Sequence, residues 1–513
     1  MPSPRTIVLV QIVVFGVGAW SHRSGFPADR ALRQRPVSAS HATATRETPT
    51  RQKQARAQQS APAPVAPAES EKIRSDIRAI EALPPQFPEH GAALFFLARL
   101  YARLGELQKA MVLLKECAAL DQGFDPGAAR GLRVLRDNAK FQELVEQARR
   151  RYPPVHHARV AFTVQERDLF PEGLAVDAKN RLFYMGSMYR KKIVKITTSG
   201  EVSNFVPEGL YGLNPVGGIR IDPVNHDVWA ASDPGETRAS ELLHFDAQGK
   251  LLERYPAPGR GSRDLNDLVL RGDRDLYATD SLADLVYRFD RNLHQFTSLR
   301  FPRPIFVPNG ITVSGDGNLL YVADMLGVLV IDLRTRVAQD LVPDAHDTLA
   351  GIDGLYWYKG DLIGVQYGTA AYRAMRWSLA KDGRRVTASE VLERGTELVN
   401  DPTTGAIFQG NFYFVANTGI YNLENDKIVD ESRLEPVHIA VVALNRVSQS
   451  GDEPPGFQMQ NQKKAPGRAA GVEPGPDPSE EKKPPVLRET LLPTVSSSAG
   501  IPSVQPRRFA GSE

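Results

Sequence analysis

The sequence predicts an all-β six-bladed β-propeller as the main domain, preceded by a small all-α helical module and flanked by disordered tails. Two observations carry the propeller prediction: one short phrase recurs six times at intervals of 43 to 51 residues, and a second apolar run follows each phrase after a turn. A third observation, the helix-like spacing of apolar residues before the first repeat, separates the helical module from the propeller.

Each phrase holds a polar or small residue, often followed by Gly, and then two apolar residues around a variable one. The six copies read EGLAV, GGIRI, NDLVL, NGITV, DGLYW and TGAIF, and they begin at Glu172, Gly217, Asn266, Asn309, Asp353 and Thr404. Repeats of roughly 40 to 50 residues built from several short apolar runs are typical of propeller blades. We therefore expect each phrase to begin the same strand of its blade.

Short turn segments separate the apolar runs inside each repeat, as DAKN and SGDGN do in the first and fourth. Such turns join neighbouring antiparallel strands, so each repeat is predicted to be a small meander. The ring of blades must be closed, because an open ring exposes a strand edge. Residues 158–164 and 438–444 are apolar runs outside the six phrases, and either could supply the closing strand.

Composition marks the remaining boundaries, with the propeller assigned to residues 155–446. Residues 1–21 hold a short apolar stretch after Arg5, which predicts a signal peptide, with an uncleaved anchor as the alternative. The protein is therefore expected to be secreted or periplasmic, and to contact a membrane only if the leader is uncleaved. Residues 22–69 and 447–513 are rich in Pro and in polar or charged side chains, and are predicted to be a disordered linker and tail.

Residues 70–152 show helical periodicity, with apolar residues three and four positions apart. Small or apolar residues stand where a tetratricopeptide repeat has its helix–helix contact: Ala98, Tyr101, Gly105, Leu107, Ala110, Leu114 and Cys117. Two packed amphipathic helices of any family give a similar pattern, so a plain helical hairpin is the alternative. The module is predicted to be tetratricopeptide-like, and it could bind a protein partner.

Composition and short motifs exclude several classes of function. The formal net charge is +3, which argues against a nucleic-acid partner. The single Cys117 cannot form an internal disulfide, and its place in an apolar helix favours burial. The sequence has no G-x-S-x-G elbow, phosphate-binding Gly-Lys-Ser/Thr loop, HExxH pair or CxxC pair. Serine hydrolase, nucleotide and zinc chemistries therefore have no support.

Strands that begin at the same phase should bring their first residues to one place, the mouth of the central channel. Four of the six first residues carry oxygen ligands: Glu172, Asn266, Asn309 and Asp353. Taken singly, each is also a common turn residue. Two carboxylates with two amides balance the charge of a divalent cation, and oxygen ligands without His or Cys favour calcium. The phase therefore predicts a site for calcium or another divalent cation.

The second strand of each blade should return to the face of the predicted metal site. Its polar end residues are then candidates for binding substrate or orienting the ligands: Ser187, Asp280, Asp324 and Asn417. Asp280 and Asp324 are the preferred candidates. An Asp at the end of a strand also commonly caps a turn, and this alternative stays open.

Four stretches carry a family resemblance: PEGLAVD, LNDLVL, PNGITVSGDGNLLYVAD and IDGLYW. They resemble the metal-binding phrases of the senescence marker protein/gluconolactonase/luciferin-regenerating enzyme family, with its relatives diisopropyl fluorophosphatase and the paraoxonases. The resemblance covers about residues 162–444 and implies a six-bladed propeller with calcium or another divalent ion at the channel mouth. It also implies hydrolysis of a small-molecule lactone, ester or organophosphate, with Asp353 as general base or nucleophile and Glu172 as an anchor of the ion.

Two positions depart from the family pattern. Gly217 or Gly218 stands where the paraoxonases place a His, and Asp264 stands two residues before Asn266, where gluconolactonases place an Arg. Sugar-lactone specificity is therefore not implied. Two functions remain open: an exported calcium-dependent hydrolase of small lactones or esters, and a non-catalytic binding scaffold, similar to propellers of NHL-type repeats, with the helical module serving assembly.

Overall fold

The computed structural model describes residues 65–233, 240–424 and 426–445 of the 513-residue chain. The predicted leader, most of the predicted linker and the tail from residue 447 lie outside the described residues. The helical module and the propeller belong to one compact unit. No helix in the described part of the chain is both long enough and apolar enough to cross a membrane.

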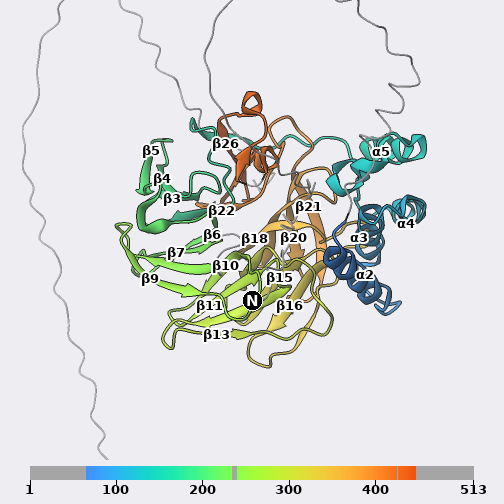
Figure 1. Cartoon of the computed structure of the whole chain (residues 1–513). Helices are drawn as coiled ribbons and strands as arrows, with labels where there is room; N and C mark the ends of the chain where they lie inside the picture. Colours follow the sequence, from blue (N-terminus) through green and yellow to red (C-terminus); the bar gives the residue numbers. More distant parts are fainter. Residues whose placement is uncertain (1–64, 234–239, 425, 446–513) are drawn as a thin grey trace, which may run out of the picture. The chain divides into compact units, whose positions relative to one another are not determined.

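Six four-stranded antiparallel sheets form the blades, which confirms the predicted propeller (Figure 1). The strands of blades one to three are β2 (Leu174–Asp177), β3 (Leu182–Gly186), β4 (Ile193–Thr197), β5 (Val202–Val206), β6 (Val216–Ile221), β7 (Val228–Ser232), β8 (Glu241–Phe245), β9 (Leu251–Pro256), β10 (Leu265–Arg271), β11 (Asp275–Asp280), β12 (Leu285–Asp290) and β13 (Gln295–Ser298). Those of blades four and five are β14 (Ile311–Val313), β15 (Leu319–Asp324), β16 (Gly327–Asp332), β17 (Ala338–Asp340), β18 (Ile352–Tyr358), β19 (Asp361–Gln366), β20 (Arg373–Leu379) and β21 (Val386–Arg394). In these five blades the strands pair in sequence order, as expected for meanders.

The sixth blade closes the ring with strands from both ends of the propeller sequence. Its strands lie in the order β22 (Gly405–Phe408), β23 (Asn411–Val415), β26 (Val437–Ala443) and β1 (Arg159–Val164). Both apolar runs considered for closure are used: 438–444 supplies the third strand, and 158–164 supplies the outermost strand, antiparallel to it. Between β23 and β26 the described chain forms two short helices and a two-stranded hairpin: η5 (Ile420–Asn422), β24 (Leu423–Glu424), β25 (Lys427–Ile428) and η6 (Glu431–Arg433).

The inner strands begin where neighbouring blades come closest together. A Cβ added at Gly173 would overlap the carbonyl oxygen of Gly217 on the next blade, and one at Gly218 would lie 2.8 Å from that of Asn266. Since a side chain does not fit at such distances, Gly lets the two backbones approach. The Gly in the repeated phrase is therefore a packing requirement of the ring.

Within the described residues the helical module comprises α2 (Pro67–Glu81), α3 (His90–Arg103), α4 (Leu107–Ala119), η1 (Pro126–Ala128), η2 (Arg130–Leu135) and α5 (Ala139–Arg151). Helix α2 begins at Pro67, so residues 67–69, predicted as linker, are helical; Pro suits this first turn because its missing N–H has no partner there anyway. Ala98, Ala110 and Cys117 are buried in the core that α3 and α4 share, as the spacing predicts. The tetratricopeptide character of this hairpin stays a prediction.

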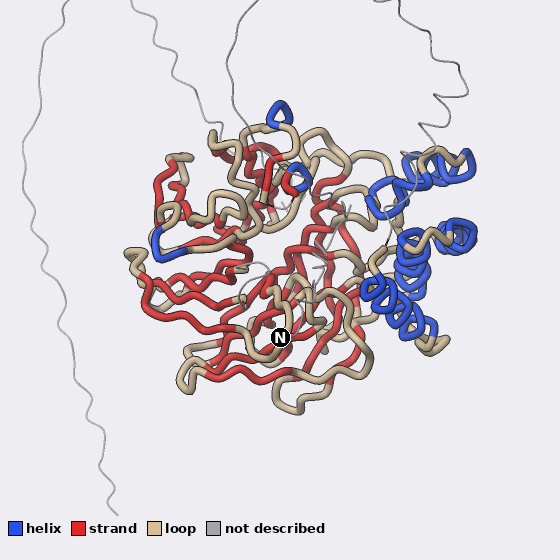
Figure 2. Tube along the Cα trace, in the orientation of Figure 1, coloured by secondary structure: helices blue, strands red, loops and turns tan. Residues whose placement is uncertain are grey.

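The helical module packs directly on the propeller. The Phe96 ring of α3 contacts that of Phe306, with centroids 5.9 Å apart. Glu89, just before α3, is buried, and its carboxylate accepts hydrogen bonds from the Thr348 hydroxyl (2.8 Å) and the Leu349 N–H (2.7 Å). The module thereby holds the loop that leads into β18. Figure 2 shows the division of the described chain into helices in this module and strands in the blades.

Candidate functional site

The four predicted metal ligands lie at equivalent points of four blades. Asn266 and Asp353 are in β10 and β18, and Glu172 and Asn309 stand two residues before β2 and β14. Asn309 and Asp353 are buried (5% and 7% exposed), whereas Glu172 and Asn266 keep more accessible surface. This placement follows the phase of the repeated phrase.

Three of the four predicted ligands interact. Burial raises the pKa of Asp353 well above its ordinary value, although a side-chain hydrogen bond from Asn309 acts in the opposite direction. Burial and then the charge of Asp353 raise the pKa of Glu172 in the same way. Asn266 lies on the inner strand β10, and its carbonyl oxygen packs against Gly218 of the neighbouring inner strand β6. Among the described residues no hydrogen bond joins its side-chain amide to the other three.

Two further acids complete a group that we call the mouth carboxylates: Glu172, Asp264, Asp353 and Asp401. The charges of Asp401 and Asp264 add to the rise in the pKa of Glu172, and that of Asp401 adds to the rise for Asp353. Burial raises the pKa of Asp264 to about 8 and that of Asp401 to about 7. Four acids from four blades therefore share one electrostatic environment.

The mouth carboxylates form no ion pair in the part of the chain that the structure describes, although the charge of Arg130 acts on Asp401. No Lys, Arg or His there lies within ion-pair distance of them, although the nearby Asp267 and Asp280 do face arginines. Both carboxylate oxygens of Asp401 are buried, and the charge of Arg130 and the N–H groups of Gly419 and Ile420 act against the rise in pKa that burial causes. Unpaired buried charges are costly, so the group must keep protons or bind a cation.

Beyond the mouth carboxylates, the inner strands carry a layer of side chains that pair with one another. Arg220 donates to Asp267 at 2.9 Å, and its guanidinium lies 5.6 Å from the centre of the Tyr356 ring. The Tyr356 hydroxyl is 2.9 Å from that of Thr404, the first residue of the sixth phrase. Thr404 is therefore engaged within this layer.

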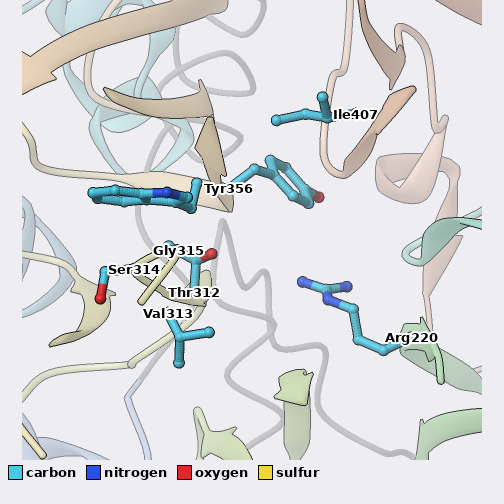
Figure 3. A pocket seen from close by; sticks show the side chains of 8 residues that line it. Arg220, Thr312, Val313, Ser314, Gly315, Tyr356 and Ile407 are labelled. Carbon is cyan, nitrogen blue, oxygen red and sulfur yellow. The ribbon is translucent and has the colours of Figure 1, made fainter. Parts of the chain in front are cut away.

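A cavity of about 380 Å³ adjoins the paired layer (Figure 3). Arg220, Tyr356 and Ile407 line it, together with Trp357 and residues 312–315. In Figure 3 the Arg220 guanidinium and the Tyr356 ring project into the same space. None of the mouth carboxylates lines this cavity, so it is separate from the predicted metal ligands.

Asp280 and Asp324, the preferred supporting residues, use their carboxylates within their own blades. Asp280 accepts hydrogen bonds from the N–H groups of Asp264 and Ala283, each at 3.0 Å. Asp324 pairs with Arg303 at 2.6 Å and accepts from the Leu326 N–H at 2.9 Å. These contacts are those of turn caps, the alternative that the sequence left open. Asp280 still supports the site indirectly, because it holds the backbone of Asp264.

Ser187 and Asn417 are likewise engaged in local structure. The Ser187 hydroxyl donates to the Leu169 carbonyl at 2.5 Å. The Asn417 side chain donates to the Pro436 carbonyl at 2.9 Å and accepts from the His438 N–H at 2.7 Å. These contacts favour a structural role for both residues over direct contact with an ion or substrate.

The sequence prediction missed several residues at the mouth. Asp264 and Asp401 had a usable signal, because each stands two or three residues before a repeated phrase. Tyr421 of η5 had none, since it lies outside the phrases. Burial raises the pKa of Tyr421 above its ordinary range, the Arg130 charge opposes this, and the charges of Asp353 and Glu172 add to it. Tyr421 therefore borders the mouth carboxylates.

The donor set at the mouth fits a hard divalent cation, because its groups are carboxylates and amides without His or Cys. The buried oxygens of Asp401 have no side-chain hydrogen-bond partner among the described residues, as expected of a carboxylate that could face a cation. Among the described residues, however, no three His, Cys, Asp or Glu side chains are gathered closely enough to form a metal site by themselves. The predicted ligand set is not such a group, since two of its four ligands are the amides of Asn266 and Asn309. Calcium binding stays a prediction.

No family model matches the chain, and no curated protein sequence matches it. Solved structures resemble it over the propeller. A gluconolactonase from Xanthomonas campestris is 16% identical, with 57% of this chain and 95% of that chain covered and a TM-score of 0.41. A PQQ-bound aldose sugar dehydrogenase from Streptomyces coelicolor is 15% identical, with 57% and 99% covered and a TM-score of 0.41.

A calcium-binding protein, regucalcin, from Agrobacterium tumefaciens is 18% identical, with 55% of this chain and 93% of that chain covered and a TM-score of 0.39. At these identities and TM-scores, the likenesses carry no argument about this chain. Propellers of one architecture support different chemistries, so an activity must be argued from the side chains.

Proposed function

We propose that the protein is a divalent-cation-dependent hydrolase of small lactones or esters, with its reaction at the mouth of the propeller channel. The observation that carries the proposal is that the mouth carboxylates act on one another and form no ion pair among the described residues. Such groups are costly for folding alone, and strongly shifted pKa values are typical of functional sites. The family resemblance of the metal-binding phrases supports the same function.

Glu172, Asn266, Asn309 and Asp353 would hold the ion, and calcium suits their oxygen donors best. When bound, such an ion polarises the carbonyl of the substrate and stabilises the negative charge that develops on its oxygen. Binding requires ionised ligands, so Glu172 and Asp353 would release the protons that burial favours. Affinity should therefore rise with pH.

Asp353 and Asp401 are the groups proposed to move protons. A general base works best when its pKa lies near the operating pH. Burial raises the pKa of Asp353 and raises that of Asp401 to about 7. Asp353 would take a proton from the attacking water, and Asp401 would donate one to the alkoxide oxygen that leaves. A lactone ring opened in this way yields a hydroxy acid.

The proposal includes export, based on the apolar leader at residues 1–21. Fractionation of cells that express the full chain tests this part. A shortened protein in the periplasm or medium supports a cleaved signal peptide. A full-length protein in the membrane fraction supports an uncleaved anchor, and a full-length cytosolic protein contradicts export.

Activity is tested by assaying the purified full chain against lactones, aryl esters and phosphotriesters, with added calcium or with chelator. We expect turnover of lactones or esters that the chelator stops and that Asp353→Asn abolishes. Asp382→Asn is the matched control, because this exposed aspartate lies in the same blade. Turnover that persists both with chelator and in Asp353→Asn would contradict the proposal.

A binding scaffold is the second candidate, and one observation favours it. A cavity of about 650 Å³ lies in the helical module, lined by residues of α4, α5 and the segment between them. Such a hollow could receive a protein partner and serve assembly. Metal binding without turnover of any compound in the panel would favour the scaffold over the hydrolase.

A further inference from the structure

Two arginines of the helical module reach the channel mouth. The Arg130 guanidinium, from η2, lies on the ring of Tyr421, and its charge acts to lower the pKa of Asp401 against the effect of burial. Arg99 of α3 lies beside η2, since a Cβ added at Gly131 would be 3.7 Å from its Nε. Its charge also reaches Tyr421. Both guanidinium groups therefore border the site described above.

Neither arginine has a complete set of partners. Arg99 Nη1 and Arg130 Nε are buried, and within the described residues they have no hydrogen-bond partner. Burial lowers the pKa of each arginine to about 10. A guanidinium that gives up water without gaining an acceptor destabilises the fold. Arg130 also has a hydrogen bond with Tyr372 and the charge of Asp401 nearby, yet each arginine keeps one buried N–H group without an acceptor, and an anion would supply it.

Aromatic rings adjoin the two arginines. Tyr421 stacks on Tyr367 with centroids 5.4 Å apart, and Tyr367 stacks on Tyr372 at 5.1 Å. Arg130 lies on Tyr421 at the end of this stack, so the rings fix the orientation of its guanidinium. The positive charge of the two arginines then favours an anion as the ligand.

We propose that Arg99 and Arg130 form a subsite that binds a carboxylate group of the substrate, remote from the ester bond that is hydrolysed. The proposal rests on the proposed function and narrows its substrates to small lactones or esters that carry a carboxylate. The fork of a guanidinium matches the two oxygens of a carboxylate. A phosphate dianion would also match the fork, but it would meet stronger repulsion from the mouth carboxylates.

The subsite makes the helical module a determinant of specificity. Both arginines come from outside the six repeats, so a propeller without the module would lack them. The buried hydrogen bonds of Glu89 to Thr348 and Leu349 hold the module in place beside β18. The same docking contact thereby fixes the arginines relative to Asp353.

Binding of benzoate and of its neutral isostere benzamide tests the subsite without requiring turnover. Isothermal titration calorimetry of the full chain is done with chelator present, so that no ion at the mouth can bind the carboxylate. We expect benzoate to bind at least about tenfold more tightly than benzamide, as for a charge-assisted bidentate pair. Arg130→Gln and Arg99→Gln should each reduce this preference, and Arg130→Lys should retain part of it.

Arg136→Gln is the matched control, because this exposed arginine lies in the same module and should leave the preference unchanged. Equal affinity for benzoate and benzamide in the unaltered protein would overturn the subsite, and so would a preference that survives in both Gln variants. Thermal unfolding of each variant identifies any loss of folding. If a Gln variant does not fold, the comparison of benzoate with benzamide in the unaltered protein and in Arg130→Lys decides.

Turnover separates this proposal from the proposed function. For a lactone and its carboxylate-bearing analogue, Arg130→Gln should raise KM for the anionic substrate about tenfold more than KM for the neutral one. Absence of hydrolysis together with preferred binding of benzoate would refute the hydrolase and keep the subsite. Hydrolysis without any preference for the anionic analogue would overturn the subsite alone.

Discussion

The propeller contains two kinds of buried carboxylate, which differ in their partners. Asp324 pairs with Arg303 and Asp222 with Arg291, both in direct ion pairs. The mouth carboxylates have no such pair among the described residues. Against the effect of burial, hydrogen bonds from Val224 and Arg291 lower the pKa of Asp222, whereas burial raises the pKa of every mouth carboxylate.

This difference separates residues that hold the fold from residues kept for a ligand. A paired carboxylate satisfies its own charge, so its blade is stable without further partners. An unpaired one is stabilised only by a proton or a cation. The two groups should therefore respond in opposite ways to the same substitution.

Asp353→Asn should have the largest effect of the substitutions considered, and this effect should be a loss of activity. We expect kcat/KM to fall by about 10³-fold or more, because the variant loses both a proposed ligand and the proposed base. With chelator present, the free energy of unfolding should not fall, since the substitution replaces a carboxyl group whose ionisation burial and neighbouring charges oppose. Steady-state kinetics and denaturant unfolding measure the two quantities. A variant that keeps more than a tenth of its activity would remove Asp353 from the mechanism.

Asp324→Asn should show the reverse pattern. We expect the free energy of unfolding to fall by about 2–3 kcal/mol, because Arg303 loses a buried, charge-assisted partner and keeps only Asp340. Activity per folded molecule should be unchanged. If the variant were stable but inactive, Asp324 would belong to the site after all, as the sequence first suggested.

The unpaired group should also give the protein an unusual pH dependence. Without a divalent cation, the native state keeps protons on Asp401 and Asp264 up to about pH 7 and 8, whereas the unfolded state releases them near 3.8. The free energy of unfolding should therefore fall as the pH rises from about 4 to 8, by about 1.4 kcal/mol per pH unit for each proton held. Denaturant unfolding across this interval tests the sign. A stability that rises throughout it would contradict the account.

Glu89→Gln should have the smallest effect. Burial raises the pKa of Glu89 to about 8, so its ionisation also opposes folding as the pH rises from about 4.5. Gln keeps one acceptor oxygen, for the Leu349 N–H, and its amide N–H can donate to the Thr348 hydroxyl oxygen, but it has no proton to release. We expect a flatter pH dependence and a change in stability at pH 6 within about 1 kcal/mol. Glu89→Ala is the contrast, since it leaves both donors unsatisfied and should lower stability at every pH.

The sequence was sufficient to predict the six blades and the equivalent positions of the four ligand residues within them, because both follow from the period of the repeat. Glu172, Asn266, Asn309 and Asp353 share a phase, and the structure keeps that phase. The role of Asp324 was not predictable, because it depends on Arg303 from the loop before the phrase of its blade. Arg99, Arg130 and Tyr421 belong to segments outside the repeats and meet only when the helical module docks. Periodicity locates residues within blades but gives no information on such contacts.

Isothermal titration calorimetry of the full chain with calcium at pH 8 tests whether the channel mouth binds a divalent cation. We expect one class of site per chain, lost in Glu172→Gln and in Asp353→Asn and retained in Asp382→Asn. The bound ion should also raise the free energy of unfolding, by about 2.7 kcal/mol at a concentration one hundred times Kd. A chain that binds no divalent cation, or that binds calcium equally well after both substitutions, would contradict this expectation.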